Sequence, residues 1–138
     1  MLVEACETRT VVDADTSEVL LRVPARAAYA RIVRVGAAAL ALRQGLGFGQ
    51  IDDLRLAIDE AMILLLDGVP DDVDVDIEVQ FRLTGGHLEL EASRDRGHPI
   101  GDAAVHRFEA IAEGLVADYA VDATTARVRL RTADAGAA

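Results

Sequence analysis

Residues 73–83 read Val-Asp-Val-Asp-Ile-Glu-Val-Gln-Phe-Arg-Leu, so apolar and polar side chains alternate there without a break. Side chains of a β-strand point alternately to the two faces of its sheet, so this stretch predicts a strand with one face on a core and the other in water. The next residues, Thr84-Gly85-Gly86-His87, have the composition of a hairpin turn. Leu88, Leu90 and Ala92 continue the inward series on a returning strand.

Two shorter stretches predict further strands. Apolar residues alternate within 18–23 and again within 127–131. The outward side chains of the last strand are Arg127, Arg129 and Arg131, and those of the strand after the hairpin include Glu89 and Glu91. Opposite charges on facing strands stabilise a sheet, so we expect these two strands to be neighbours.

Three segments, 25–44, 50–67 and 104–117, repeat apolar residues at steps of three and four and predict helices. Pro24 fits the start of the first helix because the first turn needs no amide donor from it. The apolar stripe of that helix is predicted at Tyr29, Ile32, Val33, Gly36, Ala39 and Leu40. The glycine-rich stretch 45–49 ends the helix, and we expect Phe48 to seat this loop on the core.

The predicted element order β-α-α-β-β-α-β indicates a two-layer α/β (α+β) sandwich. The sheet is expected to be mixed and mostly antiparallel, with three helices on one face. We expect a loose segment at 1–16, one domain at 17–132 and a tail at 133–138.

The composition fits one folded domain. The chain has 138 residues, of which 51% are hydrophobic and 28% charged. Its formal net charge of −10 argues against nucleic acid or a membrane surface as partner, because both attract positive charge.

The single cysteine, Cys6, excludes an internal disulfide and a multi-cysteine zinc site. The sequence has neither an apolar run of about 18 residues nor a leader pattern, so we expect a cytoplasmic protein.

Several residue types that carry chemistry are missing or scattered. The sequence contains no lysine and no asparagine, which excludes a lysine nucleophile and an asparagine ligand. His87, His98 and His106 have no carboxylate or cysteine at ligand spacing, so no metal site is predicted.

Three segments in chain order resemble the motifs of one family. They are Leu56-Ala57-Ile58-Asp59-Glu60-Ala61, Arg94-Asp95-Arg96-Gly97-His98-Pro99-Ile100, and Thr124-Thr125-Ala126-Arg127-Val128-Arg129-Leu130. Over about residues 18–132 the chain resembles the anti-sigma factors of the serine/threonine-kinase type, in the GHKL (histidine-kinase-like) ATPase superfamily. It is most similar to the actinobacterial branch, which regulates stress and sporulation sigma factors. The resemblance implies a histidine-kinase-like ATPase fold.

The resemblance also implies where ATP and Mg²⁺ would bind. In the family, a glutamate on the second helix activates the nucleophile and an asparagine four residues later holds Mg²⁺. These roles fall on Glu60 and Leu64, and a leucine offers magnesium no oxygen. In the second motif, Asp-x-Gly-x-Gly, the aspartate accepts the adenine amino group; Asp95 and Gly97 match it, but Pro99 replaces the second glycine.

The third family motif, a Gly-x-Gly that opens the next helix under the phosphates, falls near Val105-His106-Arg107. These bulky residues, and a lid reduced to a handful of residues, hinder phosphate binding at the helix start. Together with Leu64 and Pro99 they predict a degenerate nucleotide site, with Glu60 vestigial and no resident cofactor.

The resemblance further implies a protein-binding surface. Residues 28–32 correspond to the first-helix stretch whose arginine contacts both the sigma factor and the STAS-type anti-anti-sigma protein. We therefore predict partner contacts at Tyr29, Arg31 and Arg34, since arginine suits interfaces.

Three hypotheses follow. The first is an anti-sigma-factor-like regulator of transcription that binds its partner without kinase activity, a pseudokinase. The second is an active serine/threonine protein kinase that phosphorylates an anti-anti-sigma factor, with Asp59 or Asp67 as substitute magnesium ligand. The third is a structural subunit of a larger assembly. A homodimer through the Gly36-x-x-Ala39 spacing stays open, as does tight packing of that stretch on the sheet.

Overall fold

Five strands form one sheet in the order β1-β2-β3-β5-β4, and every neighbouring pair is antiparallel. The structure is a computed structural model that describes residues 16–136. The strands are β1 (Ser17–Pro24), β2 (Asp76–Thr84), β3 (His87–Arg94), β4 (Asp118–Asp122) and β5 (Arg127–Arg131). The expected loose segment at 1–16 lies, except for its last residue, outside the described residues, as does Cys6.

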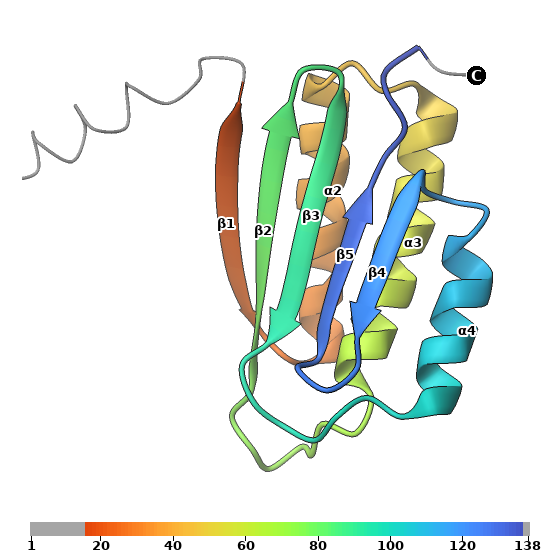
Figure 1. Cartoon of the computed structure of the whole chain (residues 1–138). Coiled ribbons are helices and arrows are strands. Elements are labelled where there is room, and N and C mark those ends of the chain that lie inside the picture. The colour runs from red at the N-terminus through yellow and green to blue at the C-terminus, as the bar shows by residue number, and fades with distance from the viewer. Residues whose placement is uncertain (1–15, 137–138) are drawn as a thin grey trace, which may run out of the picture.

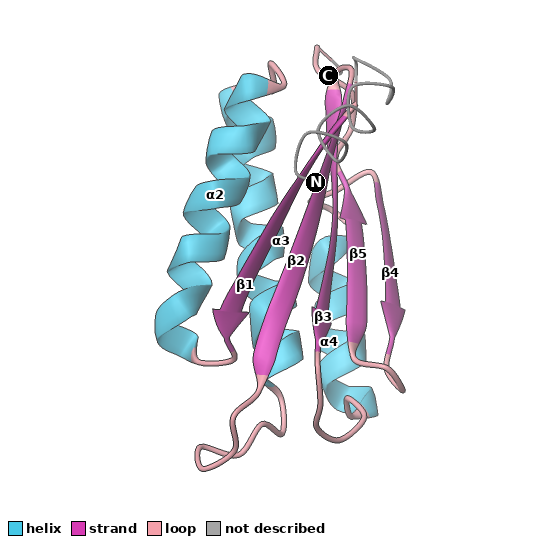
Figure 2. Cartoon of the chain, turned by 90° about the vertical axis from the view of Figure 1, so that its left-hand side faces the viewer, coloured by secondary structure: helices cyan, strands magenta, loops and turns pink. Residues whose placement is uncertain are grey.

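The helices cover one face of this sheet (Figures 1 and 2). They are a 3₁₀ turn, η1 (Ala27–Tyr29), and the α-helices α2 (Ala30–Arg43), α3 (Phe48–Leu66) and α4 (Asp102–Ala112). The two-layer α+β sandwich and the single helical face predicted from the sequence are therefore confirmed.

The core lies between the sheet and the helices, where the alternation in residues 77–92 predicted it. Ile77, Val79, Phe81 and Leu83 of β2 are all buried, and so are the inward residues Leu88, Leu90 and Ala92 of β3. Each buried leucine, isoleucine or phenylalanine side chain contributes about 1.5–3 kcal/mol through the apolar surface it removes from water. This apolar layer fixes the register of the β2–β3 hairpin, because a slip by one residue would turn every inward side chain to solvent.

The charged outer face supports the predicted strand order. Glu89 pairs with Arg131 and Glu91 with Arg129 in the β3–β5 register. The Arg127 Nη1 atom lies 2.9 Å from Glu91 Oε1. The expectation that these two strands are neighbours is confirmed.

Element boundaries differ from the prediction at three places. The helix predicted at 25–44 begins only at Ala30, after the 3₁₀ turn η1, and Pro24, predicted at its start, is the last residue of β1. The alternation at 73–83 predicts a strand from residue 73, but β2 begins at Asp76. Val75 is buried ahead of the strand, and its carbonyl accepts a hydrogen bond from the Ala25 amide instead of joining the ladder. The third helix is shorter than predicted: α4 ends at Ala112, and the chain turns into β4, a short edge strand that was not predicted.

The predicted apolar stripe of α2 is wrong, because the helix is rotated about its own axis relative to the prediction. Val33, Ala37 and Ala41 are its buried residues, whereas Tyr29 and Ile32 are exposed. The helix packs into the corner between the sheet and α3. Its buried residues therefore recur every four positions, along one side of the predicted stripe. The expected seating of Phe48 is also wrong, since 86% of this residue is exposed while Leu46 is buried in its place.

Candidate functional site

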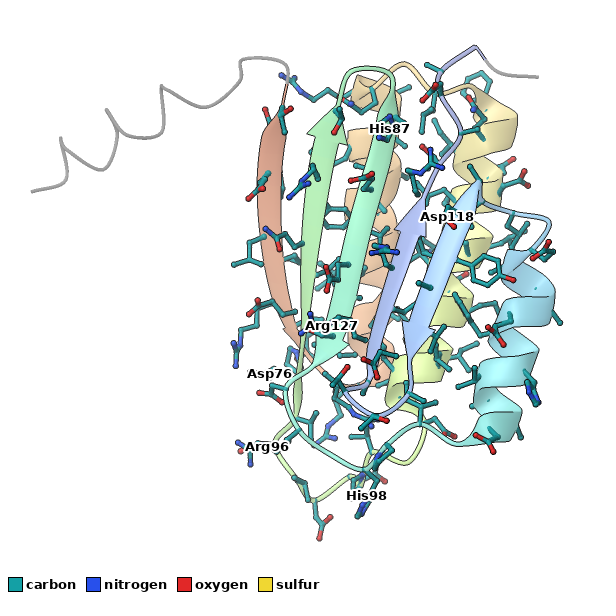
Figure 3. The ribbon with its side chains drawn as sticks, viewed as in Figure 1. Asp76, His87, Arg96, His98, Asp118 and Arg127 are labelled. Carbon is teal, nitrogen blue, oxygen red and sulfur yellow. The ribbon has the colours of Figure 1, made fainter. Side chains whose placement is uncertain are left out.

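The segments that resemble the first two family motifs, and the start of α4, meet at one end of the molecule. The carboxyl-terminal end of α3, the loop after β3 and the amino-terminal end of α4 all lie at the lower end of Figure 1. Figure 3 shows Asp76, Arg96 and His98 in this region. The structure therefore brings residues of both motifs to one end of the sandwich.

Glu60 is held by an arginine of the neighbouring helix. Its Oε1 atom accepts a hydrogen bond of 3.2 Å from Arg107 Nη2 of α4, and the Glu60 side chain is only 17% exposed. Arg107 belongs to the bulky residues that stand where the family has its third motif. The carboxylate predicted as a vestigial catalytic base is thus part of an ion pair that joins α3 to α4.

The position of the family's magnesium ligand is part of the core. Leu64 is 1% exposed, one turn after Glu60 on α3. Magnesium requires oxygen ligands in near-octahedral geometry, and this side chain supplies none. The residues present do not fit a bound Mg²⁺ of the family type.

Asp95 is held at the edge of the sheet. Its Oδ1 atom accepts a hydrogen bond of 3.0 Å from the Asp76 amide, and its Oδ2 atom accepts one of 3.3 Å from Arg22 Nη2. These bonds fasten the end of β3 to β1 and β2 and leave the carboxylate engaged. Gly97 has φ +119°, a conformation that favours glycine, and so it serves the turn of this loop.

The inward position at the end of β3 belongs to Arg94, which the sequence analysis did not single out. Its Nη1 atom donates to the carbonyls of Leu65 (2.9 Å) and Asp67 (2.8 Å) at the end of α3, and its Nη2 atom donates to the carbonyl of His98. Arg94 is 5% exposed, and a Cβ at Gly97 would lie only 3.0 Å from its Nε atom. The guanidinium fills the space between α3 and the loop.

The electrostatics of Arg94 follow from this burial. Desolvation lowers the pKa of Arg94, while the nearby Asp67 carboxylate acts in the opposite direction. The guanidinium nevertheless stays charged, because the ordinary pKa of an arginine lies far above neutral pH. It satisfies carbonyls that the last turn of a helix leaves without amide partners.

The start of α4 already faces carboxylates. Gly101 is the N-cap residue, and Asp102 lies in the first turn. The Asp67 Oδ2 atom is 3.8 Å from where a Cβ at Gly101 would lie. Negative charge near this helix terminus would repel the phosphates of a nucleotide.

The predicted partner residues lie on η1 and the first turns of α2, at the same lower end of Figure 1. Arg31 is exposed, and no ion pair of its side chain is seen within residues 16–136. Arg34 is half-buried, and its Nη1 atom lies 3.0 Å from Asp59 Oδ1 of α3. Tyr29 borders a groove whose lining includes Arg26, Asp74 and Asp76.

The histidines are far apart, as Figure 3 shows for His87 and His98. Within the part of the chain that the structure describes, no three His, Cys, Asp or Glu side chains are grouped as metal ligands. Over the same residues, no helix has both the length and the apolar character required to span a membrane.

Comparisons with known proteins give a likeness of fold. No family model matches the sequence, and no curated protein is significantly similar to it. Among solved structures the chain is similar to the RsbU and RsbW domains of Rv1364c from Mycobacterium tuberculosis, with a TM-score of 0.64 and 20% sequence identity. The match covers 84% of this chain but only 31% of that chain. This likeness supports the histidine-kinase-like fold that the motifs imply.

The sequence contained one signal for the missed Arg94. Leu88, Leu90, Ala92 and Arg94 fall on the same side of a strand, so the alternation turns Arg94 inward. The resemblance to the second family motif points to Asp95 instead, one residue further along.

Proposed function

We propose that this chain is an anti-sigma-factor-type regulator of transcription that binds a protein partner and transfers no phosphate. The observation that carries the proposal is that the carboxylates at the motif positions are already engaged in ion pairs and hydrogen bonds with other residues of the chain. Glu60 is paired with Arg107, and Asp95 accepts bonds from Arg22 and Asp76. The fold is kept while the chain's own side chains occupy the motif positions. Such a protein can still bind a protein partner through its surface.

The family resemblance of the sequence and the likeness of fold support a sigma factor or a STAS-type anti-anti-sigma protein as partner. Sigma factors expose basic regions that face DNA, and the net charge of −10 favours their approach. We assign the contact to Tyr29 and Arg31. Arg34 is less available, because its guanidinium already binds Asp59.

The nucleotide part of the proposal is tested by isothermal titration of the purified chain with ATP and Mg²⁺, alongside a thermal-shift scan. We expect no heat and no shift of the unfolding midpoint at millimolar ATP, since a ligand that binds the folded state must stabilise it. Micromolar binding would contradict the proposal. So would labelled phosphate that appears on a STAS-type protein and is lost in Glu60→Gln, which would establish the active kinase instead.

The partner is tested by titrating the chain with purified sigma factors and STAS-type proteins from the same genome. We expect one of them to bind, and Arg31→Glu to weaken this binding at least tenfold. Arg55→Glu is the matched control, because Arg55 is also an exposed helix arginine but lies on α3. Unchanged affinity in Arg31→Glu would remove this contact, and the absence of any binding would favour a structural subunit.

A further inference from the structure

The side of α2 that faces away from the core carries exposed apolar side chains. Ala37 is one of the buried residues of this helix, and Val35 and Ala39 are each two residues from it, about 200° around the helix. Ile32 and Leu42 lie on the same side, toward the two ends. The exposed fractions are 49% for Ile32, 59% for Val35 and 64% for Leu42, and Ala39 is exposed as well. Figure 2 shows α2 on the outside of the helical layer, and among residues 16–136 no other element covers this side.

These residues have the spacing along which two helices pack. Ile32, Val35, Ala39 and Leu42, here called the apolar row, follow each other at steps of three, four and three residues. Single exposed apolar residues are ordinary on a protein surface, but a continuous row of them marks a site of contact with another molecule. The apolar row extends over about 15 Å of α2, which matches about three turns of a partner helix.

Small residues flank the middle of the apolar row. Gly36 and Ala38 lie on its two sides, between Val35 and Ala39 in the sequence. A Cβ at Gly36 would meet no atom of residues 16–136 within 4 Å, apart from the backbone of its own helix. Packing within the described chain therefore does not require this glycine. A glycine in the middle of a helix weakens the helix, but it lets the backbone of another molecule approach closely.

The charges beside the apolar row are positive. Arg31 stands at one end of the row and Arg43 at the other; both are exposed, and α2 contains no acidic residue. The neighbouring helix α3 differs, because its surface carries charges of both signs, such as Asp52 and Arg55 with 3.7 Å between their charged groups. A molecule that packs on the apolar row meets a guanidinium at each end, and carboxylates are the groups that pair with guanidinium.

We propose that the apolar row of α2 is the docking surface for an amphipathic helix of a protein partner, a helix whose apolar stripe is flanked by acidic side chains. The stripe packs on the apolar row, and the flanking carboxylates pair with Arg31 and Arg43. The inference rests on the proposed function for the identity of the protein that supplies the helix. It adds the kind of segment that binds and its place along α2.

A second copy of the chain and a membrane surface fit the apolar row less well. Two α2 helices packed on each other would bring arginines together and offer no carboxylate to either of them. An anionic membrane attracts arginine, but the formal net charge of −10 repels the chain as a whole from such a surface. An acidic helix satisfies both the apolar and the charged groups of this side of α2.

Isothermal titration of the full chain with two synthetic helical peptides tests the proposal. Both peptides have about three heptads with leucine at the two apolar positions of each heptad, and they differ in carrying glutamate or lysine at the flanking positions. We expect micromolar binding of the glutamate peptide and at least tenfold weaker binding of the lysine peptide. No heat with the glutamate peptide at millimolar concentration, or equal affinity for both peptides, would overturn the proposal.

Substitutions on α2 identify the surface that binds the peptide. Val35→Glu places a carboxylate in the middle of the apolar row at an exposed position, so we expect the chain to fold and to bind the glutamate peptide at least tenfold more weakly. Leu56→Glu is the matched control, since Leu56 is 54% exposed but lies on α3. Arg43→Glu should reduce the preference for the glutamate peptide at least threefold. Equal weakening by Val35→Glu and Leu56→Glu, or an unchanged preference in Arg43→Glu, would exclude this surface.

The partner of the proposed function separates the two conclusions. If a sigma factor or STAS-type protein binds and both Arg31→Glu and Val35→Glu weaken it at least tenfold, the docking surface is supported. If only Arg31→Glu weakens it, the function stands and the docking surface is overturned. Binding of the glutamate peptide without binding of any such protein would contradict the partner and leave the docking surface standing. Cosedimentation with phosphatidylglycerol vesicles that is lost in Val35→Glu would assign the apolar row to a membrane instead.

Discussion

Arg94 places a charged guanidinium among backbone carbonyls from two segments that are far apart in the sequence. Leu65 and Asp67 end α3, and His98 lies in the loop that leads to α4. A single side chain thus joins the end of a helix to the loop that carries the second motif. Its Nε atom is buried and has no acceptor among residues 16–136, so the three carbonyl contacts must outweigh that cost.

Arg94→Met should lower the free energy of unfolding by about 2–4 kcal/mol, because it leaves buried carbonyls without donors. Chemical denaturation monitored by circular dichroism measures this difference. Arg96→Met is the control: Arg96 is exposed two residues away, and its replacement should change the stability by less than about 0.5 kcal/mol. Equal stability of both variants would mean that water replaces the guanidinium at these carbonyls.

At the scale of one element, α2 combines a buried edge of small residues with an exposed apolar side. Val33, Ala37 and Ala41 pack in the corner between the sheet and α3. The small alanines let this helix approach the sheet closely. Gly36 is the exception, since within residues 16–136 a Cβ at this position would meet no atom within 4 Å, apart from the backbone of its own helix.

Gly36→Ala should therefore raise the free energy of unfolding by about 0.5–1 kcal/mol, the usual advantage of alanine over glycine inside a helix. Chemical denaturation monitored by circular dichroism measures this change. Gly45→Ala is the contrasting variant: Gly45 has φ +82°, so an alanine there should destabilise the chain by about 1–2 kcal/mol. A destabilised Gly36→Ala variant would show that a contact within the chain needs the glycine.

At the scale of the whole molecule, the end of the chain ties the hairpin to α3. The Thr132 Oγ1 atom accepts a hydrogen bond of 3.0 Å from the Leu88 amide. Beyond it, Gln50 Nε2 donates to the Asp134 carbonyl at 3.1 Å, and the Ala135 amide donates to the Gly86 carbonyl. Segments from the middle and the end of the sequence meet here at the upper end of Figure 1.

A chain that ends at Thr132 should be less stable by about 1–2 kcal/mol, since it loses these two hydrogen bonds and their partners then face water. Differential scanning calorimetry of the shortened chain measures this loss. A chain that ends at Gly136 keeps both bonds and should unfold at the wild-type temperature. If the two shortened chains unfold at the same temperature, the contacts of Asp134 and Ala135 contribute nothing.

The fold was largely predictable because its signals are local. Alternation in β2 and β3 predicted the hairpin and its buried face, and the charges of Glu89 and Arg131 predicted which strand lies beside it. The strand β4 was not predictable on this basis. Its five residues form an edge of the sheet, where Tyr119 and Val121 are only partly covered and the alternation is too short to stand out.

The candidate site was predictable in its residues but not in its contacts. The sequence by itself determined that Leu64 offers no metal ligand and that Glu60 and Asp95 are present, because residue identity alone settles which atoms are available. Only the tertiary structure decided that Glu60 binds Arg107, that Arg34 binds Asp59 and that Arg94 fills the space beside Gly97. Each of these contacts joins residues from different elements, and packing sets their distances in a way that no local pattern records.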